Sequence, residues 1–384
     1  MGLQTNSARR HPGALLVPLW AGLLALPFTG LTGAVRIVVG TGAVVVLWRL
    51  SALEAVAKLI REAARKLSSL KAASAVAAKY AYSPAFLIAV TVVLVALPLS
   101  LNDYYRDIMT LTGMYIALAL GLNIVVGQAG LLNLGYVAFY AVGAYTYAIL
   151  STAFGLPFWP GLILGALSAA GFAVLLGLPT LRLRGDYFAI VTLGLGEITR
   201  IVLNNWDGLT GGPNGISKIG RPVIAGYTLH TTLDFYYLIL VIVLITVFVM
   251  HRLIHSRIGR AWIAIREDET AAEAMGINTF RLKLLAFVLG SAWAGLVGVF
   301  FAAKMAFVSP ESFTFFESVM ILCMVVLGGM GSIPGIVLGA FLLITLPEVF
   351  RDFQDYRMLA FGAALVLMMV FRPQGLLGGI KKTA

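Results

Sequence analysis

Long apolar runs dominate this sequence, and they limit the folds open to it more than any other feature. Hydrophobic residues fill 60% of the 384 positions and charged residues only 12%. Soluble globular proteins carry roughly 25% charged residues, whereas a helix that spans a membrane needs about 20 mostly apolar residues in a row. The sequence therefore predicts an all-α fold, a polytopic bundle of transmembrane helices, and excludes an ordinary soluble enzyme.

Charged and turn-forming clusters divide the apolar runs into about ten to twelve spans, several of them short or interrupted by glycine. The expected spans are 14–31, 34–50, 84–101, 107–126, 131–152, 159–180, 187–203, 233–252, 282–304, 315–330, 332–349 and 356–372.

Four parts follow from this division. We expect an N-terminal transmembrane hairpin extension at 1–50, a cytoplasmic amphipathic helix at 51–82, the main transmembrane domain at 83–375 and a cytoplasmic tail at 376–384. Arg9 and Arg10 before the first apolar run also fit a cleaved signal peptide, but a second apolar run begins at Val35 and favours the hairpin. Segment 51–82 has apolar residues on one face of a helix and basic residues on the opposite face, so it is either a helix lying on membrane lipid or a plain linker helix.

The distribution of basic residues predicts the orientation. With the N-terminus in the cytoplasm, about twenty of the 28 Lys and Arg residues fall on the cytoplasmic side, as membrane proteins prefer. Both termini are therefore expected in the cytoplasm. The net charge of +11 has this topological explanation, and because no nucleic-acid-binding motif occurs, no nucleic acid partner is expected.

Motifs for catalysis or cofactor binding are missing from the sequence. It contains no G-x-x-x-x-G-K-[ST] phosphate loop, no H-E-x-x-H helix and no G-x-S-x-G elbow. Its single cysteine, Cys323, lies in an apolar run and rules out an intramolecular disulfide. We therefore expect no catalytic residue, no metal site and no cofactor in this chain.

Two glycine-rich breaks echo each other in the two halves of the main domain. Short spans interrupted by glycine at corresponding positions point to a transport pathway, because a broken helix exposes backbone groups to a polar cargo. Amide side chains near the first break would add donors and acceptors, and ordinary helix packing is the alternative interpretation. The predicted pathway residues are Gly127, Gln128, Gly130, Asn133, Gly135, Tyr136, Gly328, Gly329 and Gly331.

One charged pair is expected inside the membrane. Glu197 and Arg200 are three residues apart, on one face of a helix, where each could neutralise the other. The pair is either part of an ion relay or a structural bridge. Beyond it, the long polar loop from Asn204 to Asp234 is a lid, a docking surface for an external protein or a plain glycine-rich loop.

The cytoplasmic loop at 253–281 has an exceptional density of charge for this chain. Apolar residues such as Trp262 and Ile265 recur among the charges, which predicts a short helix lying across the membrane face. Gly276 supplies a C-terminal stop for that helix.

Four blocks in a fixed order resemble the permeases of branched-chain amino acid ABC transporters, and more closely the longer, M-type subunit. The blocks are GLNIVVGQAGLLNLGYVAFYAVGAY (121–145), LRLRGDYFAIVTLGLGEITRIVLNNWDGLTGGPNGI (181–216), SRIGRAWIAIREDETAAEAMGINTFRLKLLAFVLGSAWAGLVG (256–298) and VVLGGMGSIPGIVLGA (325–340).

The resemblance implies an importer subunit of the bacterial inner membrane. Its implied partners are a second, H-type permease, two cytoplasmic ATP-binding subunits that would hold ATP and Mg, and an external amino-acid-binding protein. Loop 253–281 would then be the coupling loop, whose family pattern is E-A-A-x-x-x-G; here Thr270 replaces the Glu, and an acid stands one position earlier. The implied ATPase-coupling residues are Arg260, Arg266, Glu267, Glu269, Ala271, Ala272 and Gly276.

Three other functions stay open from the sequence. The same architecture could import urea, short amides or other amino acids. A secondary transporter driven by an ion gradient would need intramembrane acids, of which the sequence offers Glu197. A membrane-embedded enzyme would need a catalytic constellation, and the residues form none.

Overall fold

The chain divides into two units, residues 1–90 and 91–384. The computed structural model describes residues 94–183, 185–224, 226–349, 362 and 375, all within the second unit. The expected hairpin at 1–50, the helix at 51–82, the span at 356–372 and the tail at 376–384 lie outside the described residues.

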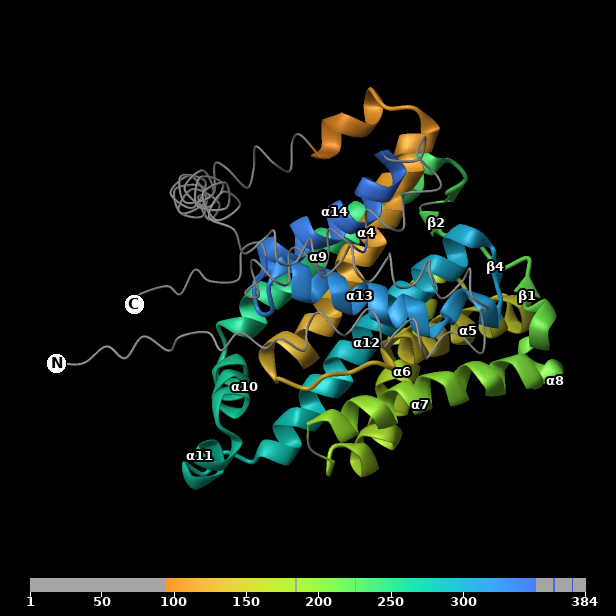
Figure 1. Ribbon diagram of the computed structural model, residues 1–384. Helices are drawn as coiled ribbons and strands as arrows, with labels where there is room; N and C mark the ends of the chain where they lie inside the picture. Colours follow the sequence, from red (N-terminus) through yellow and green to blue (C-terminus); the bar gives the residue numbers. More distant parts are fainter. Residues whose placement is uncertain (1–93, 184, 225, 350–361, 363–374, 376–384) are drawn as a thin grey trace, which may run out of the picture. The chain divides into compact units, whose positions relative to one another are not determined.

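The described part is mainly helical, as predicted (Figure 1). Its helices are η2 (Leu97–Leu99), α4 (Asp103–Asn123), η3 (Ile124–Gln128), α5 (Tyr136–Phe154), α6 (Phe158–Thr180), α7 (Asp186–Asn205), α8 (Asp207–Thr210), η4 (Gly212–Asn214), α9 (Thr232–Ile254), α10 (Arg257–Glu267), α11 (Glu269–Ala274), α12 (Thr279–Met305), η5 (Pro310–Phe313), α13 (Phe315–Gly328) and α14 (Ile333–Val349). Its strands are β1 (Ile216–Ser217), β2 (Val223–Ile224), β3 (Tyr227–Thr228) and β4 (Phe307–Val308).

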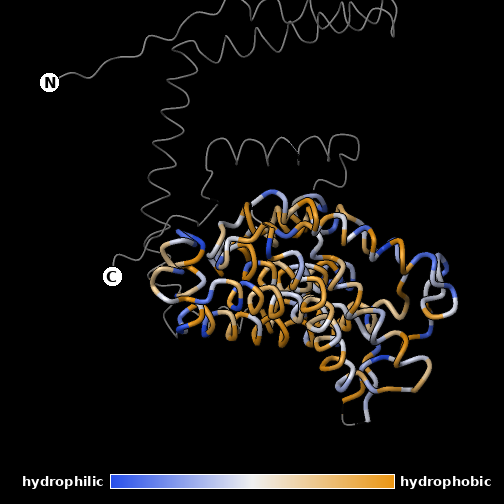
Figure 2. The backbone as a smooth tube through the Cα atoms, turned by 90° about the horizontal axis from the view of Figure 1, so that it is seen from below, coloured by the Kyte–Doolittle hydropathy of each residue, from blue (hydrophilic) through white to orange (hydrophobic). Residues whose placement is uncertain are grey.

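Six helical segments of the described residues are long and apolar enough to cross a membrane: Asp103–Gln128, Tyr136–Phe154, Phe158–Thr180, Thr232–Ile254, Thr279–Met305 and Pro310–Gly328. This confirms the predicted polytopic bundle. Helix α7 lies where the span 187–203 is expected, although it is not among the six. Figure 2 shows hydrophobic residues along most of the helical tube.

The span expected at 131–152 begins later, because α5 starts only at Tyr136. The preceding residues form a turn instead of a helix. The N–H of Leu131 donates to the carbonyl of Val125, and the N–H of Gly135 donates to the side-chain oxygen of Asn133. These bonds satisfy backbone groups that a helix would otherwise pair.

Helix α12 forms the centre of the described bundle and packs against α4, α5 and α6. Glycines allow the closest approaches. A Cβ atom on Gly143 of α5 would lie 2.2 Å from the carbonyl oxygen of Gly295 on α12, and one on Gly295 would lie 2.5 Å from the carbonyl oxygen of Gly165 on α6. Small residues at such crossings are the usual means of packing helices in membranes.

The helices run between two ends of this bundle. One end carries α10 and α11 and the other carries α8, β1 and β4 (Figure 1), and we call them the α10 end and the α8 end. At the α8 end, Lys304 pairs with Asp107 at 2.8 Å and ties α12 to α4. The Asn204–Asp234 loop also lies at the α8 end, because β1 pairs with β4.

Hydrogen bonds to α5 and α6 hold this loop in place. The hydroxyl of Tyr147 donates to the carbonyl of Gly220 at 2.8 Å, and the N–H of Gly220 donates to the hydroxyl of Ser151 at 2.9 Å. The indole of Trp159 donates to the carbonyl of Val223 at 3.0 Å. The described residues of this loop are therefore fixed against α5 and α6. Its role as a lid or docking surface stays a prediction.

Candidate functional site

The two glycine breaks predicted from the sequence meet at the α10 end. The first break follows α4, which ends in the π-helical turn η3. The N–H of Gly331 donates to the side-chain oxygen of Asn123 at 2.9 Å, and a Cβ atom on Gly127 would lie 2.7 Å from the nitrogen of Gly331. Two segments about two hundred residues apart are thus in backbone contact, and only glycine fits at Gly127.

The other glycines of the second break shape the turn between α13 and α14. A Cβ atom on Gly328 would lie 2.5 Å from the carbonyl oxygen of Gly335, so the two helices touch through backbone atoms. Gly329 and Gly331 have φ angles of 104° and 86°, in the left-handed region that favours glycine. These residues therefore have a clear packing role.

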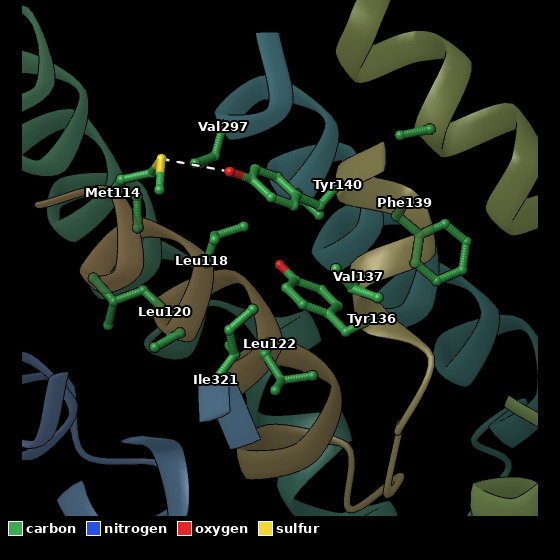
Figure 3. Close-up of a cluster of buried hydrophobic side chains, with 14 of the residues drawn as sticks. Met114, Leu118, Leu120, Leu122, Tyr136, Val137, Phe139, Tyr140, Val297 and Ile321 are labelled. Atoms are coloured by element: carbon green, nitrogen blue, oxygen red, sulfur yellow. Dashed lines mark hydrogen bonds between the residues drawn. The ribbon is translucent and has the colours of Figure 1, made fainter. Parts of the chain in front are cut away.

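The side chains predicted around the first break are buried. Gln128 is 3% exposed, Asn133 0% and Tyr136 0%. The Tyr136 hydroxyl donates to the carbonyl of Gly290 at 3.0 Å, and its ring lies in the core shown in Figure 3. A Cβ atom on Gly135 would lie 1.9 Å from the carbonyl oxygen of Thr192, so the start of α5 presses against α7.

Arg266 of α10 joins the predicted coupling loop to the glycine breaks. Its Nη1 donates to the carbonyl oxygen of Gly127 in η3, and its Nη2 pairs with Glu267 at 3.0 Å. A Cβ atom on Gly130 would lie 2.7 Å from Cγ of Arg266, so the arginine stem lies directly against that glycine. The structure thereby brings two separately predicted sites into contact.

The coupling loop contains two helices, α10 and α11, where the sequence predicts a short helix. Asp268 separates them: its backbone is extended, and its carboxylate accepts a hydrogen bond from the N–H of Ala271 at 3.0 Å, which caps α11. At the other end of α11, the N–H of Gly276 donates to the backbone carbonyl of Glu273, and the N–H of Ile277 donates to the backbone carbonyl of Ala272. This is a Schellman motif with Gly276 at a φ angle of 82°, the expected C-terminal stop.

Both short helices are fixed to α12. Trp262 of α10 is fully buried, and its indole donates to the carbonyl of Leu282 at 2.8 Å. Glu269 of α11 pairs with Lys283 at 2.6 Å, and the side chain of Lys283 is only 11% exposed. The acid one position before the family pattern therefore anchors α11 to a membrane-spanning helix.

Some of the remaining predicted coupling residues are buried and others are exposed at the surface. Ala272 is buried, whereas Arg260, Glu267 and Ala271 are exposed, and Met275 beside them is 82% exposed. An exposed apolar side chain among charges is suited to contact with another protein.

The predicted charged pair is present on α7. Nε of Arg200 lies 2.9 Å from Glu197, and each side chain is about one-third exposed at 33% and 32%. A second intramembrane acid escaped the sequence analysis: Glu317 on α13 accepts a hydrogen bond from the hydroxyl of Tyr115 at 2.6 Å. An acidic residue within the expected span 315–330 was the signal available for it.

Two cavities lie along α5. The larger, about 430 Å³, opens between α5, α6 and α7 and reaches α8. The smaller, about 10 Å³, is lined by the predicted pathway residues Asn133 and Gly135 among others. Among the described residues, no group of His, Cys, Asp and Glu side chains is arranged to hold a metal ion.

The family of the chain follows from comparison with known proteins. Residues 104–371 match the model of a family described as the permease component of the branched-chain amino acid transport system. The chain belongs to this family. It is a multi-pass membrane protein and a transport permease component, in agreement with its six apolar helices.

Two curated relatives illustrate the similarity. The chain is 49% identical over 315 residues to the high-affinity branched-chain amino acid transport system permease protein LivM of Escherichia coli, covering 76% of this chain and 74% of the relative. It is 27% identical over 291 residues to the corresponding protein LivH of the same organism, covering 70% of this chain and 92% of the relative. No solved structure matches the chain.

Proposed function

We propose that this chain is the M-type permease of an ATP-driven importer for leucine, isoleucine and valine in the bacterial inner membrane. The observation that carries this proposal is the similarity to LivM, which extends over three quarters of both chains. Its weaker similarity to LivH supports a second, H-type permease as its partner in one transport system.

ATP hydrolysis belongs to two separate ATP-binding subunits in this proposal, which would hold the ATP and Mg. The exposed residues of α10 and α11, together with Met275 directly after α11, are suited to meet such a subunit. The contacts that the same helices make with α12 and η3, through Trp262, Glu269 and Arg266, would carry its movement into the membrane domain. Both termini would then lie in the cytoplasm, and an external amino-acid-binding protein would deliver cargo at the α8 end.

Reconstitution tests the proposal directly. The chain is placed in proteoliposomes with the second permease, both ATP-binding subunits and the external binding protein of its own transport system, and uptake of radiolabelled leucine is measured with ATP inside. Uptake that needs ATP, the binding protein and every subunit is the expected result. The matched control replaces one ATP-binding subunit with a hydrolysis-deficient form.

Two outcomes would overturn the proposal. Uptake by the chain alone under an ion gradient would make it a secondary transporter, with Glu197 and Glu317 as the acids to examine. An external binding protein that retains urea or a short amide and ignores leucine would change the cargo while keeping the architecture.

A further inference from the structure

The hairpin formed by β2 and β3 presents an apolar face to its surroundings. Ile224 and Tyr227 are cross-strand partners, so both side chains point to the same face of the hairpin. They are 45% and 57% exposed, and Val223 beside them is also exposed. Two residues separate the strands, and the second of them, Gly226, has a φ angle of 87°. This short turn keeps the two apolar side chains together at the tip of the hairpin.

A hydrogen bond attaches the hairpin to the first turn of α6. The indole Nε1 of Trp159 donates to the carbonyl of Val223 at 3.0 Å, and the Trp159 side chain stays exposed. Helix α6 is one of the six described helices that are long and apolar enough to cross a membrane. The hairpin therefore lies at the end of α6 where this helix enters the membrane.

Helix α6 has an apolar outer face along its length. Trp159, Ile163 and Leu167 follow one another at intervals of four residues, which places them on one face of the helix, and all three are exposed. Val174 and Leu178 continue this exposed stripe toward the other end of α6. The hairpin is thus continuous with a face that extends along the membrane-spanning length of the helix.

Lipid matches this outer face of α6 better than a protein partner does. The helix contains no charged residue, whereas the neighbouring α7 carries the Glu197–Arg200 pair with both side chains about one-third exposed. Charged groups are costly in hydrocarbon, which favours a protein contact for α7 and leaves α6 as the face suited to acyl chains. A hairpin attached to the start of α6 then lies at the boundary between acyl chains and lipid headgroups.

The residue types around the hairpin also suit this boundary. Trp and Tyr are enriched there because each combines an apolar ring with a polar group. The Trp159 indole and the Tyr227 hydroxyl, which donates to Asp234 at 3.4 Å, both keep the polar group bonded while the ring is exposed. Lys218 and Arg221, shortly before β2, are exposed basic residues that are suited to meet lipid phosphates.

We propose that the β2–β3 hairpin inserts the side chains of Ile224 and Tyr227 into the lipid leaflet at the α8 end, between the headgroups and the acyl chains. The hairpin anchors the Asn204–Asp234 loop in the membrane, and Trp159 joins this anchor to α6. The inference concerns a lipid-binding surface and is independent of the cargo and of the energy source of transport. The second permease and the external binding protein are the alternative occupants of this face.

Fluorescence quenching in proteoliposomes locates the hairpin. In a Cys323→Ser background, Ile224→Cys is labelled with an environment-sensitive fluorophore, and the full chain is measured alone and with the other transporter subunits. Lipids with a nitroxide near the headgroup should quench it more than lipids with a nitroxide near the bilayer centre, because interfacial segments lie roughly 5–10 Å deep. Iodide in the water should quench it little. Tyr227→Cys is a second probe on the same face.

The matched control is Asn214→Cys, at an exposed polar residue of the same loop, which iodide should quench and the nitroxide lipids should not. Iodide quenching of Ile224→Cys as strong as that of Asn214→Cys would place the hairpin in water and overturn the inference. Protection from both quenchers that depends on the second permease or on the external binding protein would show that a protein covers the face, and would also overturn it. Leucine uptake by the same vesicles reports on the proposed function separately.

A charge at the tip tests whether the apolar face holds the hairpin in lipid. Tyr227→Asp, added to the labelled Ile224→Cys chain, should abolish quenching by the headgroup nitroxide and restore quenching by iodide, because a carboxylate is disfavoured among acyl chains. Tyr227→Phe keeps the ring and should retain the nitroxide quenching. Monodisperse elution of each variant shows that it is folded. Unchanged nitroxide quenching in folded Tyr227→Asp would refute the assignment of this face to lipid.

Discussion

The contact between Arg266 and Gly127 leads to a quantitative prediction about coupling. Arg266 lies on α10, the helix proposed to face an ATP-binding subunit, yet its Nη1 bonds the chain's own backbone at the first glycine break. We expect Arg266→Gln to weaken the link between α10 and η3 and to leave the buried anchors Trp262 and Glu269 in place. ATP would still be hydrolysed, but less of its energy would reach the membrane domain.

The size of the effect follows from the type of bond. A hydrogen bond from a charged donor contributes about 1.5–3 kcal/mol. Because the Arg266 side chain is 33% exposed, water offsets part of that contribution, and the lower limit of about 1.5 kcal/mol applies. This corresponds to a shift of roughly tenfold in the equilibrium between attached and detached α10. Arg266→Lys should fall between wild type and Gln, since lysine keeps the charge but lacks the fork that reaches two acceptors.

The assay is the number of ATP molecules hydrolysed per leucine imported by reconstituted transporter. Arg266→Gln should raise this ratio by about tenfold, mainly through slower uptake. Arg257→Gln, at an exposed arginine on the same helix, is the matched control and should leave the ratio at the wild-type value. Equal losses of hydrolysis and uptake in Arg266→Gln would show that the residue only stabilises the fold or the ATPase contact, and would refute the coupling argument.

Three further predictions concern contacts that stabilise the fold. Lys283→Met should lower the free energy of unfolding by about 2 kcal/mol because it leaves Glu269 unpaired, and adding Glu269→Leu should restore most of the loss in thermal unfolding; a double variant as unstable as the single one would contradict this. Gly143→Ala should disrupt the packing of α5 on α12 and make the purified chain aggregate in size-exclusion chromatography, because its Cβ would lie 2.2 Å from a backbone oxygen of α12; a monodisperse variant would disprove it. Tyr115→Phe should cost about 1 kcal/mol of stability by removing the 2.6 Å bond to Glu317, and an unchanged unfolding midpoint would show that this bond is not needed.

Hydropathy was sufficient to predict most of the described helices, but their exact ends depend on capping. The start of α5 lies at Tyr136 and not at residue 131 because Asn133 and the preceding turn satisfy the backbone locally. The split between α10 and α11 likewise depends on one extended residue, Asp268, that caps the second helix. Apolar periodicity alone does not show where a side chain such as that of Asn133 or Asp268 bonds backbone groups in place of the helix. By contrast, the helix stop at Gly276 could be predicted, because a left-handed φ angle after a helix has a strong glycine signature.

The residues of the candidate site could be predicted only as two separate groups, and the contact between the groups could not be predicted. The glycine breaks and the coupling loop were recognised from spacing and charge, but the bond from Arg266 to Gly127 joins positions 139 apart, and sequence periodicity carries no information on such pairs. The larger cavity was missed for a similar reason. Its wall comes from α5, α6, α7 and α8, and its residues are ordinary aliphatics and threonines that no motif distinguishes.

The contacts that α10 and α11 make with the membrane domain determine which part of that domain would move when these helices are displaced. Trp262 and Glu269 bind them to α12, which is held at the bundle centre by backbone contacts at Gly295 and at its far end by Lys304. Arg266 binds them instead to η3, a π-helical turn, and such turns are less favourable than α-helix and are frequent at functional sites. The more deformable of the two attachments is therefore the one at η3. Because η3 continues through Gly130 to Asn133, we expect movement of α10 to alter the small cavity that Asn133 lines before it alters the core.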